Sequence, residues 1–430
     1  MEHVFLEIAF LTMIGIFLIS SLIQKYTRIP LPHSMIVLAF VMHNNFPELL
    51  QLDAKENFDH IMFFLIPLIL MYDAMHLKWI DVKAYKWSIA YLAIFSVSLS
   101  ILVGSSLYFF NIFGTTMTLA AYVVLFSMNM ATDAISVGNI FSQFKGIPHN
   151  IKVLVEGESL GNDATAMIAF YFIGLPWLLA GSFDLTSIPW IAIKVFAIST
   201  VIGLAVAYAG YFFLKIFDFI KEEIVIILAV AYGSFVGAEL IHVSGIFSLI
   251  VAMIAITALI DKSLTIPLDQ KIKANDHKAL RKFLKKEVSS KANQDTIHHT
   301  LDIFSFFAVL LVFTSMAALI NFDNLFSYWK EILIMFAVTT LIRATVMAKF
   351  VLVGKKTKAI DYVGFNGWVI LTLAGIKGSL SIIMLHALPK TFEFYELFES
   401  VTIGVILLST FVYGFVLLGY MVIQEKRSAE

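Results

Sequence analysis

Long runs of apolar residues recur along the whole chain and are separated by short polar stretches. A helix that crosses the hydrocarbon core of a bilayer, roughly 30 Å thick, needs about 20 apolar residues at 1.5 Å per residue. About thirteen such windows can be placed, at residues 5–23, 31–47, 58–76, 88–110, 114–142, 150–175, 187–214, 223–242, 244–260, 301–320, 331–353, 363–387 and 398–422. The pattern therefore predicts an all-α polytopic membrane protein with about 13 transmembrane helices.

The least certain division is the close pair of windows around His242–Gly245. One long helix there would give twelve spans and place both termini on the same side of the membrane. The positive-inside rule separates these alternatives, because it places Lys and Arg on alternate loops. With thirteen spans, basic residues gather on one side at positions 25, 28, 78, 83, 86, 145, 152, 215, 221, 261–300, 355, 356, 358, 426 and 427, and only Lys55, Lys330 and Lys390 lie on the other.

That distribution predicts a multi-pass protein of the cell inner (plasma) membrane, with the N-terminus outside and the C-terminus cytoplasmic. Residues 261–300, the one long polar stretch, are expected to form a cytoplasmic loop. Only ten residues follow Tyr420, so no C-terminal regulatory domain is expected. The N-terminus carries acidic residues where a signal peptide would have basic ones, and we interpret it as the first membrane helix.

Composition narrows the function classes. The chain of 430 residues is 60% hydrophobic and 14% charged, against roughly 25% charged residues in an ordinary soluble domain. A formal net charge of −1 suggests no nucleic-acid partner. The absence of cysteine excludes disulfides, thiolate catalysis and cysteine-ligated metals. No HExxH motif is present, and the GxSxG match at residues 157–161 (GESLG) lies inside an apolar window and not at the strand-to-helix elbow of a hydrolase, so we expect no enzyme and no cofactor.

The segment 156–166, EGESLGNDATA, places four polar residues in two helical turns of an apolar run: Glu158, Ser159, Asn162 and Asp163. A charged side chain at the centre of a membrane helix costs roughly 2.5–3.5 kcal/mol, so such residues usually mark an ion or proton pathway. Residues four apart share a helix face. Ser159 and Asp163 should therefore line a cavity, while Glu158 and Asn162 face a neighbouring helix. Simple helix-to-helix adhesion would suit Ser159 and Asn162, but not two carboxylates.

The fifth window contains the sequence ATDAISVGN, with Thr132 and Asp133 well inside it. Thr and Asp side chains can bond their own backbone and compete with the helix, which makes this a place for the helix to unwind and expose carbonyls. Carbonyls and a carboxylate are ligands for a hard alkali cation. The alternative is a helix-end aspartate near the interface.

Two cations lie deep in the second half, Arg343 and Lys377. Arg343 can bind a carboxylate with two parallel bonds, and pairing with Glu158 would leave Asp163 for chemistry. Lys377 lies between Gly375 and Gly378, a spacing that favours a break in the twelfth window, where the lysine could neutralise the negative ends of two half-helices. Snorkelling of both side chains to the interface is the alternative.

The two predicted breaks occupy corresponding positions. If residues 1–175 and 223–422 form two inverted-topology repeats joined by a linker helix at 187–214, each break lies in the fifth helix of its half. Paired broken helices at corresponding positions point to a transporter site at the membrane midplane. No residue-level repeat is evident, so this division rests on topology. It predicts one transmembrane transport domain over residues 1–430.

These motifs resemble the monovalent cation/proton antiporters, in the Asn-Asp branch that includes the NhaP-like sodium/proton antiporters of bacteria and archaea. EGESLGNDATA is similar to the signature of the sixth helix in that branch, ATDAIS to the Thr-Asp-Pro element of the fifth, and LIRA to the segment with the buried arginine. AGIKGSLSIIMLHALP resembles the penultimate helix, YGSFVGAELIHVSGI the eighth-to-ninth segment and FLIPLILMYDAMHL the third helix. The matches extend over nearly the whole chain.

The resemblance implies thirteen helices, a homodimer, and a six-helix core that moves against a dimerisation domain by alternating access. It implies electroneutral exchange of one Na⁺ for one H⁺, with Asp163 as the principal cation and proton carrier. Asp133, Thr132 and Ser159 would complete the Na⁺ site. Asn162 and the Glu158–Arg343 pair would hold its architecture, with Lys377 in a supporting role.

Two positions depart from the family pattern. Ala134 stands where the family usually has proline, and Lys377 where arginine is common. Both departures affect local geometry and leave the cation ligands in place. The expected partners are Na⁺, or Li⁺ or K⁺, together with H⁺ and the lipid bilayer. The alternatives are a K⁺-selective cation/proton antiporter and a cation channel, although the chain has no TVGYG-like filter.

Overall fold

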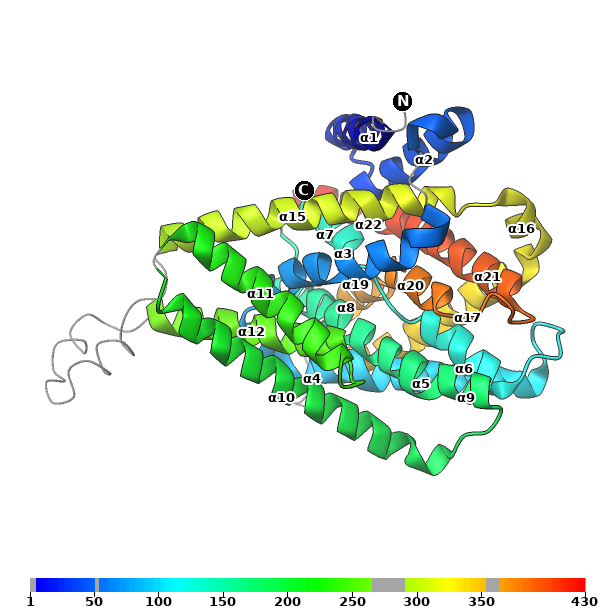
Figure 1. Cartoon of the computed structure of the whole chain (residues 1–430). Helices are drawn as coiled ribbons and strands as arrows, with labels where there is room; N and C mark the ends of the chain where they lie inside the picture. Colours follow the sequence, from blue (N-terminus) through cyan, green and yellow to red (C-terminus); the bar gives the residue numbers. More distant parts are fainter. Residues whose placement is uncertain are drawn as a thin grey trace, which may run out of the picture. The chain divides into compact units, whose positions relative to one another are not determined.

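The computed structural model describes residues 5–50, 54–144, 146–217, 219–264, 291–352 and 363–429. Within these ranges every regular element is helical (Figure 1). The elements before residue 182 are α1 (Phe5–Thr27), α2 (Leu31–Asn45), η2 (Pro47–Leu50), α3 (Ala54–His76), α4 (Trp79–Ala90), η3 (Tyr91–Ser96), α5 (Val97–Ser106), η4 (Leu107–Phe110), α6 (Leu119–Met128), α7 (Ala134–Phe141), α8 (His149–Ala169), η5 (Phe170–Gly174) and α9 (Leu175–Ala180). The all-α prediction is confirmed.

The later elements follow the same pattern. They are η6 (Leu185–Ser187), α10 (Ile188–Leu214), α11 (Ile220–Glu239), α12 (Gly245–Leu264), α15 (Lys291–Ala318), α16 (Phe322–Ser327), α17 (Trp329–Met347), α18 (Lys349–Leu352), α19 (Gly364–Leu373), α20 (Leu380–His386), α21 (Tyr395–Leu408), η7 (Ser409–Tyr413) and α22 (Gly414–Ala429). Each predicted apolar window overlaps at least one of these helices. In the described part of the chain, 8 helical stretches are long and apolar enough to cross a membrane, and shorter apolar helices accompany them. The total of thirteen spans stays a prediction.

The close pair of windows near residue 242 forms two separate helices. α11 ends at Glu239 and α12 begins at Gly245. Between them His242 adopts a left-handed backbone conformation with φ of 57°, and the Glu239 carboxylate accepts a 2.8 Å hydrogen bond from the N–H of Gly245. This bond satisfies a donor at the start of α12 and fixes the turn. The single long helix of the twelve-span alternative is therefore not formed.

The chain divides into two compact units. The first comprises residues 1–63, 85–185 and 309–430, and the second residues 64–84 and 186–308. In the second unit α10, α11 and α12 pack against one another (green in Figure 1). The inverted repeats at 1–175 and 223–422 and the linker helix at 187–214 describe a symmetry of topology, and they stay a prediction. Of the expected 261–300 loop, residues 265–290 lie outside the described residues, and residues 261–264 and 291–300 belong to α12 and α15.

Two helices of the first unit are broken, as the sequence predicts. Residues 129–133 separate α6 from α7, and residues 374–379 separate α19 from α20. The Asn129 side-chain amide donates to the carbonyl of Leu125 at 2.9 Å, and Asp133 caps α7. Polar side chains therefore end the first half-helix and start the second, which explains how the helix unwinds with Ala134 in place of proline. The two breaks meet, because the N–H of Asp133 donates to the carbonyl of Ile376 at 2.8 Å.

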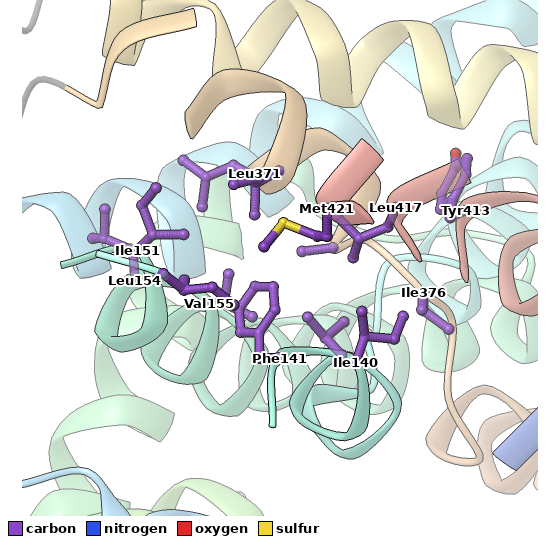
Figure 2. Packing of buried hydrophobic residues seen from close by; sticks show 14 of the residues in the cluster. Ile140, Phe141, Ile151, Leu154, Val155, Leu371, Ile376, Tyr413, Leu417 and Met421 are labelled. Carbon is purple, nitrogen blue, oxygen red and sulfur yellow. The ribbon is translucent and has the colours of Figure 1, made fainter. Parts of the chain in front are cut away.

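A cluster of buried apolar side chains lies beside the second break (Figure 2). Ile140 and Phe141 of α7 pack with Leu154 and Val155 of α8. The cluster also includes Leu371 of α19, Ile376 of the second break, Tyr413 of η7, and Leu417 and Met421 of α22. Because lipid tails are as apolar as these side chains, close van der Waals packing rather than water exclusion is the main stabilising contribution within a membrane. The packing holds α7 and α8 against the second break and the end of α19.

Gly161 lets α8 approach η3 closely, and its replacement by alanine should destabilise the protein. A Cβ at this position would overlap the Cβ of Ala93, whose own side chain cannot move aside. Overpacking of this kind costs about 1–3 kcal/mol. The expected result is a lower melting temperature of the purified protein. Gly15→Ala in α1 is the matched control, since nothing lies within 4 Å of its added Cβ, and it should leave the melting temperature unchanged or raise it.

Candidate cation site

Two residues of α8 hold the first break through Thr132. The hydroxyl of Ser159 donates to the carbonyl of Thr132 at 2.7 Å, and the amide of Asn162 donates to the Thr132 hydroxyl at 2.6 Å. All three side chains are buried. Within a membrane each backbone polar group needs a protein partner, and the contact from Ser159 meets that need for the unwound carbonyl of Thr132. The hydroxyl oxygens of Ser159 and Thr132 keep lone pairs that can face a cation.

Asp163 lies on α8 one turn beyond Ser159. Residues four apart share a helix face, so the carboxylate of Asp163 shares the face whose Ser159 hydroxyl contacts the break at Thr132. The side chain is buried, and Asp163 lies close enough to Lys377 for the two charges to interact. A carboxylate, two hydroxyls and unwound backbone carbonyls are therefore presented from α8 and the 129–133 break. Oxygen ligands of this kind suit a hard cation.

Asp133 is the N-cap residue of α7. One carboxylate oxygen accepts the N–H of Ile135 at 3.1 Å, and the other accepts the N–H of Ser136 at 3.3 Å. The hydroxyl of Ser136 donates to that second oxygen as well. A negative charge at a helix N-terminus is favoured by the helix dipole. The structure thus assigns Asp133 a structural contact at the start of a half-helix, and its remaining lone pairs can still face a cation.

Glu158 and Arg343 form a buried, two-pronged ion pair between α8 and α17. The two guanidinium Nη atoms of Arg343 donate to the two carboxylate oxygens of Glu158 at 2.5 and 2.9 Å. The Glu158 side chain is 4% exposed and the Arg343 side chain is 12% exposed. The sequence predicts this pairing, because each charge needs a counter-charge in the membrane. Glu158 consequently faces the scaffold rather than the break.

Arg343 also binds the end of α19. Its Nε donates to the carbonyl of Thr372 at 3.0 Å, and its Nη2 donates to that of Leu371 at 2.7 Å. These carbonyls belong to the last turn of a half-helix, where they lack partners within the helix. The sequence predicts that Lys377 neutralises the negative ends of the half-helices. At the end of α19, Arg343 has this role instead. The arginine can reach these carbonyls because its planar fork offers five donors.

Lys377 is buried in the second break. Its backbone N–H donates to the hydroxyl of Ser409 in η7 at 2.9 Å, and its ammonium lies within electrostatic range of Glu158, Asp163 and Arg343. The neighbouring glycines allow the close packing, since a Cβ on Gly375 would overlap the Arg343 side chain and one on Gly378 would lie 3.0 Å from the Cβ of Asp133. η7 is a π-helical turn, an element that often occurs at functional sites.

One sequence expectation about helix faces is wrong. Asn162, expected to face a neighbouring helix together with Glu158, instead donates to Thr132 in the break. The physical reason is that residues three apart are also neighbours on a helix, so Asn162 lies close enough to Ser159 to reach the same target. Ser136 and Ser409 were not selected from the sequence at all. Ser136 lies inside the ATDAIS motif, three residues after the Asp that it contacts, whereas nothing near Ser409 indicates its distant partner.

Known proteins share sequence similarity with this chain. Residues 8–422 match the family model described as "Sodium/hydrogen exchanger, transmembrane". Among curated relatives, the Na⁺/H⁺ antiporter NhaG of Bacillus atrophaeus is 27% identical over 69% of this chain and 52% of its own length. The Na⁺/H⁺ antiporter NhaP of Pseudomonas aeruginosa is 29% identical over 45% of this chain and 46% of its own length. The chain spans about half the length of these two relatives.

The fold matches a solved structure over nearly its whole length. The sodium proton antiporter MjNhaP1 from Methanocaldococcus jannaschii superposes with a TM-score of 0.67, covering 95% of this chain and 99% of that protein. The two sequences are 17% identical in this superposition. At that identity the match establishes a shared fold.

Proposed function

Because this chain belongs to the transmembrane sodium/hydrogen exchanger family, we propose that it is a secondary active antiporter that exchanges a monovalent cation, Na⁺ first, for H⁺. The observation that carries the proposal is the attachment of α8 to the first break, where Ser159 and Asn162 bind Thr132 one turn or less from Asp163. This arrangement places a membrane carboxylate among hydroxyl and carbonyl oxygens. The names of the curated relatives, Na⁺/H⁺ antiporters, support the same function.

The proposed mechanism is a competition at Asp163. Its carboxylate binds either a proton or a cation, and the bound cation takes further oxygen ligands from Ser159, Thr132 and Asp133. An unneutralised carboxylate is costly to carry through the apolar part of the membrane, so only the proton-bound and cation-bound forms cross between the two sides. Alternating access of one site then couples inward movement of one ion to outward movement of the other.

The scaffold residues keep the ligands in place during this cycle. Arg343 ties α8, α17 and α19 together through Glu158 and two carbonyls. Lys377 lies within electrostatic range of Asp163 and anchors its own backbone on Ser409. Of the adjacent residues Asn162 and Asp163, only Asp163 can change its charge, because the asparagine side chain is neutral. One proton replaced by one Na⁺ gives an electroneutral 1:1 exchange.

The location, orientation and oligomeric state of the protein are part of the same proposal. The distribution of Lys and Arg supports a multi-pass protein of the plasma membrane, with the N-terminus outside and the C-terminus cytoplasmic. We expect a homodimer that works without a cofactor and without enzymatic activity. Many apolar side chains of the described helices are exposed, for example Phe109 and Phe110. Such side chains are suited to contact with lipid.

The exchange assay uses the purified full chain in vesicles that contain a pH-sensitive dye and an imposed proton gradient. Adding NaCl or LiCl outside should collapse the gradient, and choline chloride should not. A response to KCl that exceeds the response to NaCl would favour the K⁺-selective alternative. Failure of every alkali cation to move protons would contradict antiport.

Electroneutrality is tested in the same vesicles by clamping the membrane potential with valinomycin and K⁺. The initial rate of Na⁺-driven proton movement should not change when the clamped potential is varied. A rate that follows the potential would rule out the 1:1 stoichiometry. A Na⁺ current without any proton movement would identify a channel instead.

Asp133→Asn separates the capping contact from the proposed cation contact. Asparagine is a good N-cap residue but has one acceptor oxygen where Asp133 uses two, so the variant should fold with a slightly lower melting temperature. Loss of the charge should raise the Na⁺ concentration for half-maximal exchange at least about tenfold, as changes beside metal sites commonly do. An unchanged Na⁺ dependence would restrict Asp133 to its structural role. Ser136→Ala is the complementary control, since it removes a cap contact and no charge.

A further inference from the structure

The second compact unit contains a cavity of about 680 Å³ that is separate from the candidate cation site. Its walls come from α10, α12 and the start of α4. The lining is mostly apolar, with Leu204 and Tyr208 on α10, and Trp79 and Ile80 at the start of α4. These four side chains are exposed within the chain. The cavity is therefore an open apolar groove.

The groove is long enough to cross the hydrocarbon part of one leaflet of a bilayer. Its lining on α12 runs from Phe247 through Ile250, Ile254 and Ala258 to Lys262, a stripe with the spacing of one helix face. Fifteen steps along a helix span about 22 Å, whereas half of a hydrocarbon core is about 15 Å. A groove of this length can hold an acyl chain from the middle of the membrane to its surface. The small side chain of Ala258 leaves room for it.

Charge is confined to one end of the groove. Lys78 precedes α4, while Asp261 and Lys262 lie in the last turn of α12, and all three line the cavity. Together they carry a net charge of about +1, which complements a headgroup with one net negative charge. Trp79 lies next to this end, and tryptophan is enriched where a membrane meets water. The positive-inside prediction places the same end on the cytoplasmic side.

We propose that this groove is a binding site for an anionic glycerophospholipid of the cytoplasmic leaflet, with an acyl chain between α10 and α12 and the headgroup phosphate at Lys78 and Lys262. The occupant is phosphatidylglycerol, whose single net negative charge matches the lysine end. A zwitterionic lipid fits the apolar part equally well but carries no net charge that complements the lysine end. The lipid thereby fills the space between α10, α12 and the start of α4.

The test places the full chain in phosphatidylcholine vesicles that contain an equal fraction of either phosphatidylglycerol or phosphatidylcholine with brominated acyl chains. Bromine quenches nearby tryptophan, and the contribution of Trp79 is the difference between the wild type and Trp79→Phe. Brominated phosphatidylglycerol should quench Trp79 more strongly than brominated phosphatidylcholine. Each lysine near an anionic lipid should account for roughly a fivefold preference.

Three variants sharpen the result. Lys78→Gln combined with Lys262→Gln should reduce the quenching of Trp79 by brominated phosphatidylglycerol to the level given by brominated phosphatidylcholine. Ala258→Phe, which fills the groove and keeps both lysines, should reduce quenching by both lipids. Lys83→Gln is the matched control, because Lys83 lies on α4 outside the groove lining, and it should change nothing.

Three results would overturn the proposal. Equal quenching by both brominated lipids in the wild type would mean ordinary contact with bulk lipid, and absence of quenching would mean that a second copy or another part of the chain covers the groove. A preference that survives the double lysine change would also contradict it. If Trp79→Phe does not fold, native mass spectrometry of phosphatidylglycerol retained by the wild type and the lysine variants provides the same comparison.

Discussion

Asp163→Asn should abolish cation-driven proton movement in vesicles and reduce it to the level of protein-free vesicles. Asparagine has nearly the same shape as aspartate, but it can neither take up a proton near neutral pH nor neutralise a bound Na⁺. The competition between the two ions at this position is then lost. Fluorescence of an internal pH dye after addition of NaCl measures the effect, with the amount of reconstituted protein matched to the wild type.

The matched control for this change is Asp323→Asn. Asp323 lies exposed in the first turn of α16, outside the site, and its loss of charge should leave exchange unchanged. The Asp163→Asn protein should also elute as a folded species with a melting temperature close to that of the wild type. Full exchange activity in a folded Asp163→Asn protein would refute the assignment of Asp163 as the ion carrier.

Glu158→Gln should destabilise the protein strongly, because it leaves the Arg343 guanidinium without its counter-charge. Breaking a buried ion pair by removing one partner typically costs about 3–5 kcal/mol. The glutamine carbonyl can accept one of the two bonds, which places the expected loss near the lower end of this range. The measurement is the free energy or temperature of unfolding of the detergent-solubilised protein.

An exposed ion pair of the same unit provides the control. Arg28 and Glu425 are joined at 3.0 Å, with side chains 52% and 42% exposed. Glu425→Gln should change stability by about 0–1 kcal/mol, as expected for a surface pair. Equal effects of Glu158→Gln and Glu425→Gln would show that the buried pair does not support the fold.

The double variant Glu158→Gln with Arg343→Met separates the two contacts of Arg343. It removes the stranded charge, so it should recover part of the stability lost in Glu158→Gln alone. Recovery should be incomplete, because the carbonyls of Leu371 and Thr372 lose their donor. Complete recovery would mean that the bonds to α19 contribute nothing measurable.

The broken helices could be predicted from sequence because their causes are local. The side chains of Asn129 and Asp133 bond backbone groups within a few residues of their own position, and Gly375 and Gly378 flank the second break. The Glu158–Arg343 pair followed from a general requirement, since a charge in an apolar medium needs a partner and few are available. Helix ends at Glu239 and Gly245 also follow from a short polar turn.

The contacts between the breaks could not be predicted in the same way. Asp133 meets Ile376, and Lys377 meets Ser409, across large separations in sequence. Nothing in the local pattern around residue 409 indicates that its hydroxyl accepts an N–H from the second break. Asn162 was expected to face a neighbouring helix together with Glu158, and only the packing of α8 against the 129–133 break shows that its amide binds Thr132.

The order of apolar and polar residues therefore established an all-helical membrane protein, the places where two helices break, and the charges that must be compensated. These properties depend on hydropathy and on short-range competition for backbone hydrogen bonds. The tertiary structure decided which groups meet: Asn162 with Thr132, Asp133 with Ile376, and Arg343 with both Glu158 and the end of α19. Such partners are selected by the requirement that each polar group in a break be satisfied by whichever segment packs beside it, and this becomes known only when the helices are assembled.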